Sequence, residues 1–470
     1  MPGPLAGIRV IEIGQEIQGP YAALFLRDLG ADVIKVEVPN VGDLSRHMPV
    51  VLFAGPDAPH GSISHYFLAM NRGKRSMTLD LKKPAGKEVL YRLLGTADVL
   101  ISNYRPGVLD RLGFGYDELG RRNPRLIYAM GSSWGPVGPW VTRPSRDTLA
   151  QAASGIMAKN GLPSDPPLPC GALVADHSGA LTLMAGVLAA LYAREHTGKG
   201  QKVDASIYGT MLALQPMEID FTSISGIETR RAGRGHQFLH GVWGAFPTKD
   251  GWICLAGVDD RRWPRFCEVM GLQHLIDDPR CDNLTRNFYG DAIEEILEQA
   301  FSDKTTDEWL RLLTDADVLI APVQQYKDLL ESEQALQNGY ISWMEHPQIG
   351  AVKVVGNPIT LSDTPVAAPA AAPELGQHTE EVLLEIGYTW EEIAQLREQA
   401  VLSPQRTAHD WGDVRRGAVM RYDGRQTEQS RVHSARLCLR RTRRLGLIGR
   451  LRSAGWAWYR PPCGGTSGRR

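Results

Sequence analysis

The carboxylate best placed for chemistry in this sequence is Asp176, in the stretch Val174-Ala-Asp-His-Ser-Gly-Ala180. It comes directly before a long apolar segment, which is predicted to form a helix over Ser178–His196. An Asp at this place commonly accepts hydrogen bonds from the first free backbone N–H groups of the helix, as an N-cap. The positive end of the helix would equally keep a nucleophilic carboxylate ionised, and the small neighbours would let a bulky thioester approach. The sequence permits both roles and does not choose between them.

Two further motifs compete with Asp176. Ser133 lies in Gly131-Ser-Ser-Trp-Gly135, which matches the G-x-S-x-G pattern of serine hydrolases. The next residues, Pro136-Val-Gly-Pro139, cannot begin the helix that would help to form an oxyanion hole, so a loop at a strand end is the favoured interpretation. The turn Gly14–Gly19 follows a predicted strand but lacks the glycine spacing of a dinucleotide site. A plain α/β crossover is favoured there.

The elements that would position these residues alternate between β-rich and helical runs, which indicates a parallel sheet covered by helices. Strands are predicted at 8–13, 32–37, 76–80, 98–102, 126–131 and 202–207, and helices at 21–29 and 84–94. The first 224 residues therefore predict the N-terminal part of a large, Rossmann-like open α/β domain with at least five strands.

A second block is predicted at 225–325, as a smaller α+β domain. Its strands are expected at 243–246 and 252–256, and its helices at 263–270, 292–301 and 307–316. The apolar run Val318–Val323 and the helices after Gly376 are expected to return to the first domain. The large domain would then be built from both ends of the chain, with 326–400 as its second part.

The composition is that of a cytoplasmic protein with reduced thiols. The six cysteines show no paired spacing and no histidine cluster completes a metal site, so no metal is expected. The apolar run Leu181–Ala193 is shorter than the roughly 20 residues that cross a bilayer. Residues 401–470 hold 16 Arg, no Lys and 4 acidic residues, a net charge of 16 − 4 = +12. This tail is predicted to be largely disordered, and without a recognition motif it does not indicate nucleic-acid binding.

A series of segments carries a resemblance over about residues 5–396. In order, these are Leu5-Ala-Gly-Ile-Arg-Val-Ile-Glu, Gly19-Pro20, Leu29-Gly-Ala-Asp-Val-Ile-Lys-Val-Glu37, Asn71-Arg-Gly-Lys-Arg-Ser-Met-Thr-Leu-Asp-Leu-Lys82, Ala97-Asp-Val-Leu-Ile-Ser-Asn-Tyr-Arg-Pro-Gly107, Asp110-Arg-Leu-Gly-Phe114, Asn123-Pro-Arg-Leu-Ile-Tyr128, Thr197-Gly-Lys-Gly-Gln-Lys-Val-Asp204 and Leu375-Gly-Gln-His-Thr379. On these segments the chain resembles the class III CoA-transferases, a family that also contains α-methylacyl-CoA racemases.

The resemblance implies an acyl-CoA:carboxylate CoA-transferase with Asp176 as the nucleophile and an aspartyl-CoA intermediate. It further implies an acyl-CoA donor and a carboxylic acid acceptor as substrates, no permanently bound cofactor, and a homodimer of two interlocked chains. By position in the family pattern, the residues expected to line the CoA site are Gln18, Leu79, Asp80, Lys82, Asn103, Tyr104, Arg105 and Arg111.

Two departures from the family patterns narrow the function. The racemase branch has a histidine where this chain has Arg146, and a guanidinium is a poor general base. Racemisation is therefore disfavoured and is kept only as the alternative within the family. Serine hydrolysis through Ser133 is the alternative outside the family. The formyl-CoA transferases have four successive glycines where this chain reads Gly233-Arg-Gly-His236, so a formyl/oxalate pair is not favoured.

Overall fold

The computed structural model describes residues 2–55, 59–60, 62–282 and 288–403. Its largest sheet has six parallel strands in the order β3-β2-β1-β4-β5-β6. The strands are β1 (Arg9–Ile13), β2 (Asp32–Glu37), β3 (Arg75–Thr78), β4 (Val99–Ser102), β5 (Ile127–Ser132) and β6 (Lys202–Ser206). The strand order reverses between β1 and β4, and ligands of open α/β sheets bind at such a point, beyond the carboxyl ends of the strands.

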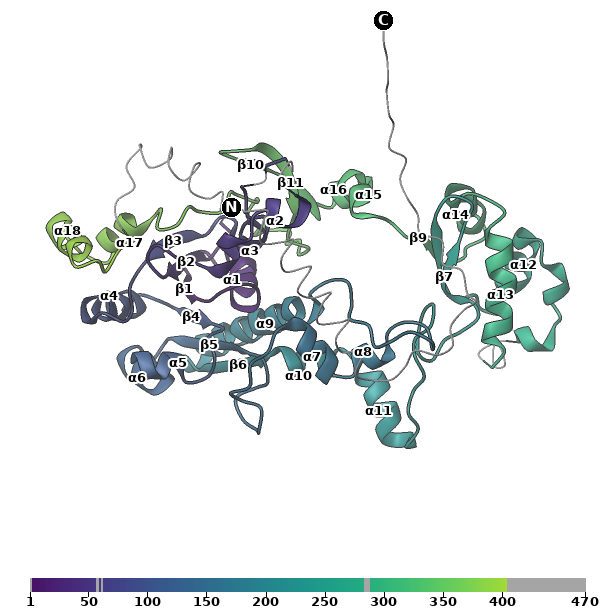
Figure 1. The fold of residues 1–470 in the computed structure, drawn as a ribbon, viewed down its shortest axis with the longest axis horizontal. Helices are drawn as coiled ribbons and strands as arrows, with labels where there is room; N and C mark the ends of the chain where they lie inside the picture. The colour runs from purple at the N-terminus through teal and green to yellow at the C-terminus, as the bar shows by residue number, and fades with distance from the viewer. Residues whose placement is uncertain (1, 56–58, 61, 283–287, 404–470) are drawn as a thin grey trace, which may run out of the picture. The chain divides into compact units, whose positions relative to one another are not determined.

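Helices cover both faces of this sheet (Figure 1). On one face, α4 (Pro84–Gly95), α17 (Thr379–Glu385) and α18 (Trp390–Glu398) share a buried cluster with side chains such as Ile11 and Ile34. On the other, α1 (Gln18–Asp28) and α9 (Val174–Thr197) pack on Val10, Val99 and Ile127. The central strands β4 and β5, which are buried on both faces, are correspondingly rich in apolar residues, while β1 and β2 also hold charged residues such as Glu12 and Lys35. The helices α17 and α18, which follow Gly376, thus pack against the first sheet.

The helix α9 begins earlier than the sequence indicated. Its first residue is Val174 instead of Ser178, so Asp176 is the third residue of the helix and not its N-cap. Among the described helices, α9 alone is long and apolar enough to cross a membrane. It lies against α1, β5 and β6 and contributes Leu183 and Val187 to the core. This packing accounts for its apolar composition without a membrane.

A second, three-stranded antiparallel sheet has the order β7-β8-β9. Its strands are β7 (Trp243–Pro247), β8 (Trp252–Ala256) and β9 (Ile320–Pro322), and the neighbouring helices are α12 (Trp263–Met270), α13 (Gly290–Phe301) and α14 (Thr306–Thr314). The prediction that Val318–Val323 returns to the first domain is wrong, because Ile320 pairs with Leu255 of β8. The domain limits 1–224, 225–325 and 326–400 remain predictions.

The remaining elements are connections. They are α2 (Val51–Ala54), α3 (His65–Asn71), α5 (Val108–Leu112), α6 (Tyr116–Arg122), α7 (Asp147–Ala153), α8 (Ile156–Lys159), α10 (Ile207–Ala213), α11 (Pro216–Ser225), α15 (Tyr326–Glu331), α16 (Glu333–Gln337) and the hairpin β10 (Ile341–His346) with β11 (Gly350–Val355). The predicted tail began at Val401, yet Val401 and Leu402 are buried in the cluster of α4 and α18. The rest of that tail, from 404 onwards, lies outside the described residues.

Candidate active site

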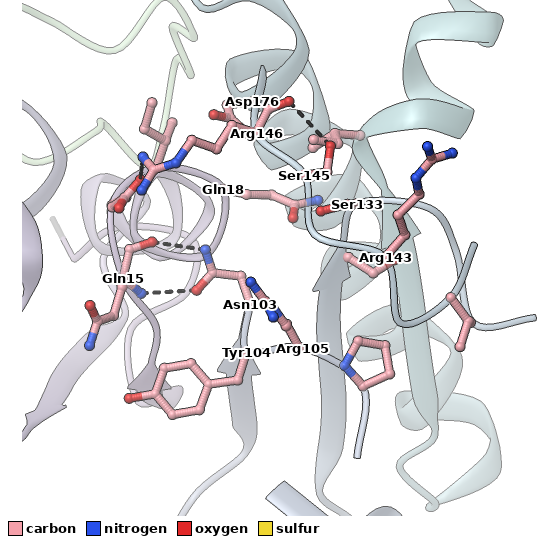
Figure 2. Close-up of a pocket in the computed structure, with 16 residues that line it drawn as sticks. Gln15, Gln18, Asn103, Tyr104, Arg105, Ser133, Arg143, Ser145, Arg146 and Asp176 are labelled. Atoms are coloured by element: carbon pink, nitrogen blue, oxygen red, sulfur yellow. Dashed lines mark hydrogen bonds and ion pairs between the residues drawn. The ribbon is translucent and has the colours of Figure 1, made fainter. Parts of the chain in front are cut away.

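A pocket of about 250 Å³ lies at the carboxyl ends of the central strands, beside the N-terminus of α9 (Figure 2). Its walls come from the segments that follow β1, β4, β5 and β6, together with the first turn of α9. The lining residues are Gln15, Glu16, Ile17, Gln18, Asn103, Tyr104, Arg105, Pro106, Ser132, Ser133, Val141, Arg143, Ser145, Arg146, Asp176 and Ile207. The pocket therefore spans the strand-order reversal, where the fold predicts a ligand site.

Asp176 is held in the pocket by a carboxylate from another helix. Oδ1 of Asp147, the first residue of α7, accepts hydrogen bonds from the backbone N–H groups of Ala175 at 2.7 Å and Asp176 at 3.0 Å. Its other oxygen accepts from Gln151 Nε2 at 2.5 Å. Asp147 thus caps the helix that carries Asp176, so the Asp176 carboxylate is free for another use. A cap from a residue 29 positions away is not visible as a local sequence pattern.

Burial, together with the negative charges of Asp147 and Glu16, raises the pKa of Asp176 to about 7, and the positive charge of Arg146 acts in the opposite direction. A carboxylate with a pKa near neutrality keeps more basicity, and therefore more nucleophilicity, than an exposed aspartate. It is also half-ionised at a working pH, as nucleophiles and general bases in active sites commonly are. The combination of partial burial, position in the pocket and raised pKa makes Asp176 the candidate for the reactive group.

Replacing Asp147 with Asn is expected to move the acid limb of the rate profile to lower pH. The limb of kcat/KM should lie near pH 7 in the unmodified protein, since the ionised Asp176 is the reactive form. The amide oxygen of Asn still accepts N–H groups from α9, but the negative charge that raises the pKa of Asp176 is gone. Asp117→Asn on the exposed side of α6 should leave the limb in place. A limb that moves to higher pH in the Asp147 variant would contradict this account.

The loop after β1 is fixed by Asn103, which follows β4. The Asn103 side chain accepts from the Gln15 N–H at 2.9 Å and donates to the Gln15 carbonyl at 2.8 Å (Figure 2). Gly14 and Gly19 leave room for it, because a Cβ on either would stand 3.0–3.2 Å from Asn103 Oδ1. The Asn103 amide is thus occupied in joining two loops of the pocket.

Gln18 reaches across the base of the pocket towards Ser133 (Figure 2). Its side chain is buried, and Nε2 donates to the carbonyl of Ala205 at 3.1 Å. Gly131 makes room for it, since a Cβ there would stand 2.6 Å from Gln18 Oε1. Gly179 of α9 leaves similar space, with Gln18 Nε2 3.3 Å from the position of its Cβ. Both glycines are thus needed by the shape of the pocket.

Gly131→Ala is expected to lower activity by about tenfold or more with a folded protein, because the new methyl group displaces Gln18 from the pocket. The measurement is kcat/KM together with the midpoint of thermal unfolding. Gly95→Ala is the matched control, since a Cβ at Gly95 on α4 meets nothing within 4 Å. Equal activity of the two variants would show that the position of Gln18 does not matter.

The structure brings together five of the nine residues proposed for the site, namely Gln18, Asn103, Tyr104, Arg105 and Asp176. Four others do not line the pocket. Leu79, Asp80 and Lys82 follow β3 at the edge of the sheet, where Leu79 is buried and Lys82 is exposed. Arg111 is an exposed residue of α5. For these four residues, a place in the CoA site remains a prediction.

Sequence reasoning missed several lining residues, of which the polar ones are Gln15, Glu16, Ser132, Arg143 and Ser145. The available signal was their position, because Glu16 follows β1 and the loop with Arg143 follows β5. His177 does not line the pocket; its ring packs edge-on against Tyr21, and Nδ1 contacts the Leu173 carbonyl at 2.8 Å.

Ser133 lines the pocket but is not on a nucleophile elbow. The segment after it has no helix before α7, which begins at Asp147, and none of the described residues that line the pocket is a histidine. A serine nucleophile needs a base within hydrogen-bond reach and a third group that orients the base. The arrangement does not supply that pair, which agrees with the interpretation of this segment as a strand-end loop.

Comparisons with known proteins agree with this fold. A model of CoA-transferase family III matches residues 5–379. The acetyl-CoA:oxalate CoA-transferase of Acetobacter aceti is 35% identical over 373 residues, which cover 78% of this chain and 92% of that protein. The succinyl-CoA:glutarate CoA-transferase of Mus musculus is 31% identical over 384 residues, covering 82% and 86%. The crystal structure of a CAIB/BAIF family protein from Brucella suis superposes with a TM-score of 0.72 at 30% identity, covering 82% of this chain and 100% of that one. The chain therefore belongs to CoA-transferase family III.

Proposed function

We propose that the protein transfers CoA from an acyl-CoA to a carboxylic acid through a covalent aspartyl-CoA at Asp176. The observation that carries this proposal is a half-buried carboxylate with a pKa of about 7 that lines a pocket and is not used to cap its own helix. The family and the relatives that act on acyl-CoA and dicarboxylic acids support the same chemistry.

The proposed reaction proceeds in four steps. An Asp176 oxygen attacks the acyl carbonyl carbon, the C–S bond breaks, and CoA leaves as a thiolate beside a mixed anhydride. The thiolate attacks Cγ of Asp176, which releases the first carboxylate and leaves aspartyl-CoA. The acceptor carboxylate attacks Cγ and frees the thiolate again, and the thiolate then attacks the acceptor's acyl carbon, so that the new acyl-CoA and Asp176 are released. Dividing one exchange into such steps is the usual benefit of covalent catalysis.

The pocket supports this route in two ways. Its volume of about 250 Å³ accepts the acyl end of a CoA thioester and leaves the nucleotide outside. We expect the thioester arm to contact Gln18, Asn103, Tyr104 and Arg105. Beyond the pocket, we expect CoA to contact Leu79, Asp80, Lys82 and Arg111.

The proposal includes an interlocked homodimer. The exposed apolar side chains of α11, among them Met217 and Ile224, are consistent with a covered surface.

The test is a steady-state assay with an acyl-CoA donor and an acid acceptor, in which each new acyl-CoA is separated and identified. Parallel lines in double-reciprocal plots are expected, because the first acid leaves before the second binds. Exchange of the α-proton of a 2-methylacyl-CoA without transfer would instead support racemisation, and release of free CoA without an acceptor would support hydrolysis. Arg146 at the position of the racemase histidine favours neither of these.

A further inference from the structure

Arg146 lines the pocket with most of its hydrogen-bonding capacity unused. Its side chain is 72% exposed, and Nη1 contacts Glu16 Oε2 at 3.0 Å. A guanidinium has five N–H donors in a planar fork. No other hydrogen bond or ion pair of this guanidinium occurs among the described residues, so one edge of the fork is available to a ligand.

Glu16 is held as a fixed neighbour of Arg146. It is one of the few described non-glycine residues with a positive φ, at 61°. Its N–H donates to Asp43 Oδ1 at 3.1 Å, and Asp43 is buried against Lys35 Nζ at 2.8 Å. Because a left-handed backbone at such a residue persists only where its surroundings enforce it, the loop presents the Glu16 carboxylate to Arg146 by construction.

The charges around the nucleophile explain what the guanidinium would bind. Glu16 and Asp147 raise the pKa of Asp176, Arg146 lowers it, and the nearby Tyr66 hydroxyl has a pKa raised by burial and by Glu16 and Asp176. A substrate with a second carboxylate adds one more negative charge to this group. That charge is tolerated only if a cation in the pocket pairs with it.

The other arginine on the loop after β5 is committed to a different contact. The guanidinium of Arg143 lies over the ring of Trp140 at 5.1 Å, and the Arg143 carbonyl accepts from Trp134 Nε1 at 3.0 Å. In Figure 2 its side chain is directed away from Asp176. Arg146 is therefore the better placed of the two for a substrate that reacts at Asp176.

We propose that Arg146 is a specificity-determining residue, which binds the distal carboxylate of a dicarboxylic substrate while the reacting carboxylate faces Asp176. In the free protein Glu16 pairs with the Arg146 guanidinium, so Glu16 competes with the substrate carboxylate for it. This inference rests on the proposed function, since it assigns the substrate class of the same site. Arg146 is then expected to increase the preference for a dicarboxylic substrate, and Glu16 to decrease it.

The test compares succinate with its monomethyl ester as acceptors, which differ only in the distal charge. The unmodified protein should prefer succinate by about tenfold or more in kcat/KM, as a charge-assisted contact commonly provides. Arg146→Gln should bring this ratio close to one, and Glu16→Gln should raise it. The ratio cancels any effect of either substitution on the ionisation of Asp176, because both acids react with the same carboxylate.

Arg121→Gln is the matched control, since Arg121 forms an exposed ion pair with Glu118 on α6, and its ratio should stay at the starting value. Arg143→Gln should also leave most of the preference. A ratio that persists in Arg146→Gln, or that changes in the same direction in both members of the pair, would overturn the inference.

Calorimetric titration of the unreacted protein with the two acids separates this inference from the proposed function. Tighter binding of succinate that is lost only in Arg146→Gln supports the role of Arg146 even if no CoA is transferred. Equal binding of the two acids to the unmodified protein refutes that role even if aspartyl-CoA forms.

Discussion

Asp176→Asn should lower the rate of CoA transfer by about 10⁴-fold or more, the usual cost of removing a covalent nucleophile. The amide cannot attack a thioester, and no other lining carboxylate shares the position of Asp176 in the first turn of α9. The measurement is single-turnover transfer from an acyl-CoA at saturating concentration. Asp176→Glu is the companion variant, since it keeps the carboxylate but moves it by one methylene. Its rate is expected to lie between that of the unmodified protein and that of Asp176→Asn.

The Asn variant should be folded and, at pH 8, at least as stable as the unmodified protein. In the folded state the pKa of Asp176 is raised from 3.8 to about 7, so the folded protein binds a proton more tightly than the unfolded chain does. The resulting contribution to stability is present below about pH 4 and is lost as the pH rises through 7. Above pH 7 the ionised Asp176 carboxylate therefore lowers the stability of the folded protein, and Asp176→Asn removes this destabilising charge. Thermal unfolding at pH 5 and pH 8 checks it, and a lower midpoint at pH 8 would show that the carboxylate also supports the fold.

Glu12→Gln is expected to destabilise the protein by about 3–5 kcal/mol, because it breaks a buried group of ion pairs. The Glu12 side chain is fully buried, and its two oxygens lie 2.5 Å from Lys35 Nζ and 2.6 Å from Lys74 Nζ. An amide would leave two buried ammonium groups with one charged partner, Asp43. The free energy of unfolding in urea at pH 7 is the measurement.

Activity should fall with stability in this variant, because the same cluster holds the pocket. Lys35 Nζ donates to the Gly14 carbonyl at 3.0 Å, and Lys74 Nζ donates to the Pro20 carbonyl at 2.7 Å, so both ends of the loop after β1 are anchored. Glu118→Gln, which removes surface ion pairs with Arg121 and Arg122, is the control and should leave unfolding nearly unchanged. Similar unfolding curves for the two variants would mean that the buried cluster is not needed for stability.

The large sheet was predictable because its signals are local. The β-branched residues of Ile8–Ile13 and Asp32–Glu37 favour strands, and the observed strands fall within a few residues of the expected ones. The start of α9 was misplaced for a physical reason. Its first turn is stabilised by Asp147, which lies far away in sequence, so the local pattern suggested a later start. The same long-range contact decides that Asp176 is not a cap.

Some residues of the candidate site could likewise be found from local signals, and others could not. Asp176 and the residues after β1 and β4 could be found from strand ends and from the resemblance, because parallel strands bring their carboxyl ends to one edge. Glu16 and Arg146 could not be paired from sequence, since 130 residues separate them and only the fold brings them into contact. The pairing of β9 with β8 is likewise decided by a contact between residues far apart in sequence.

The most direct test of the central claim is the intact mass of the purified protein after incubation with a panel of acyl-CoA donors, followed by peptide mapping. The account predicts a CoA-sized adduct on the peptide that contains Asp176, which is absent in Asp176→Asn and is discharged by an acid acceptor. An adduct on another residue, or CoA transfer that continues in Asp176→Asn, would contradict it.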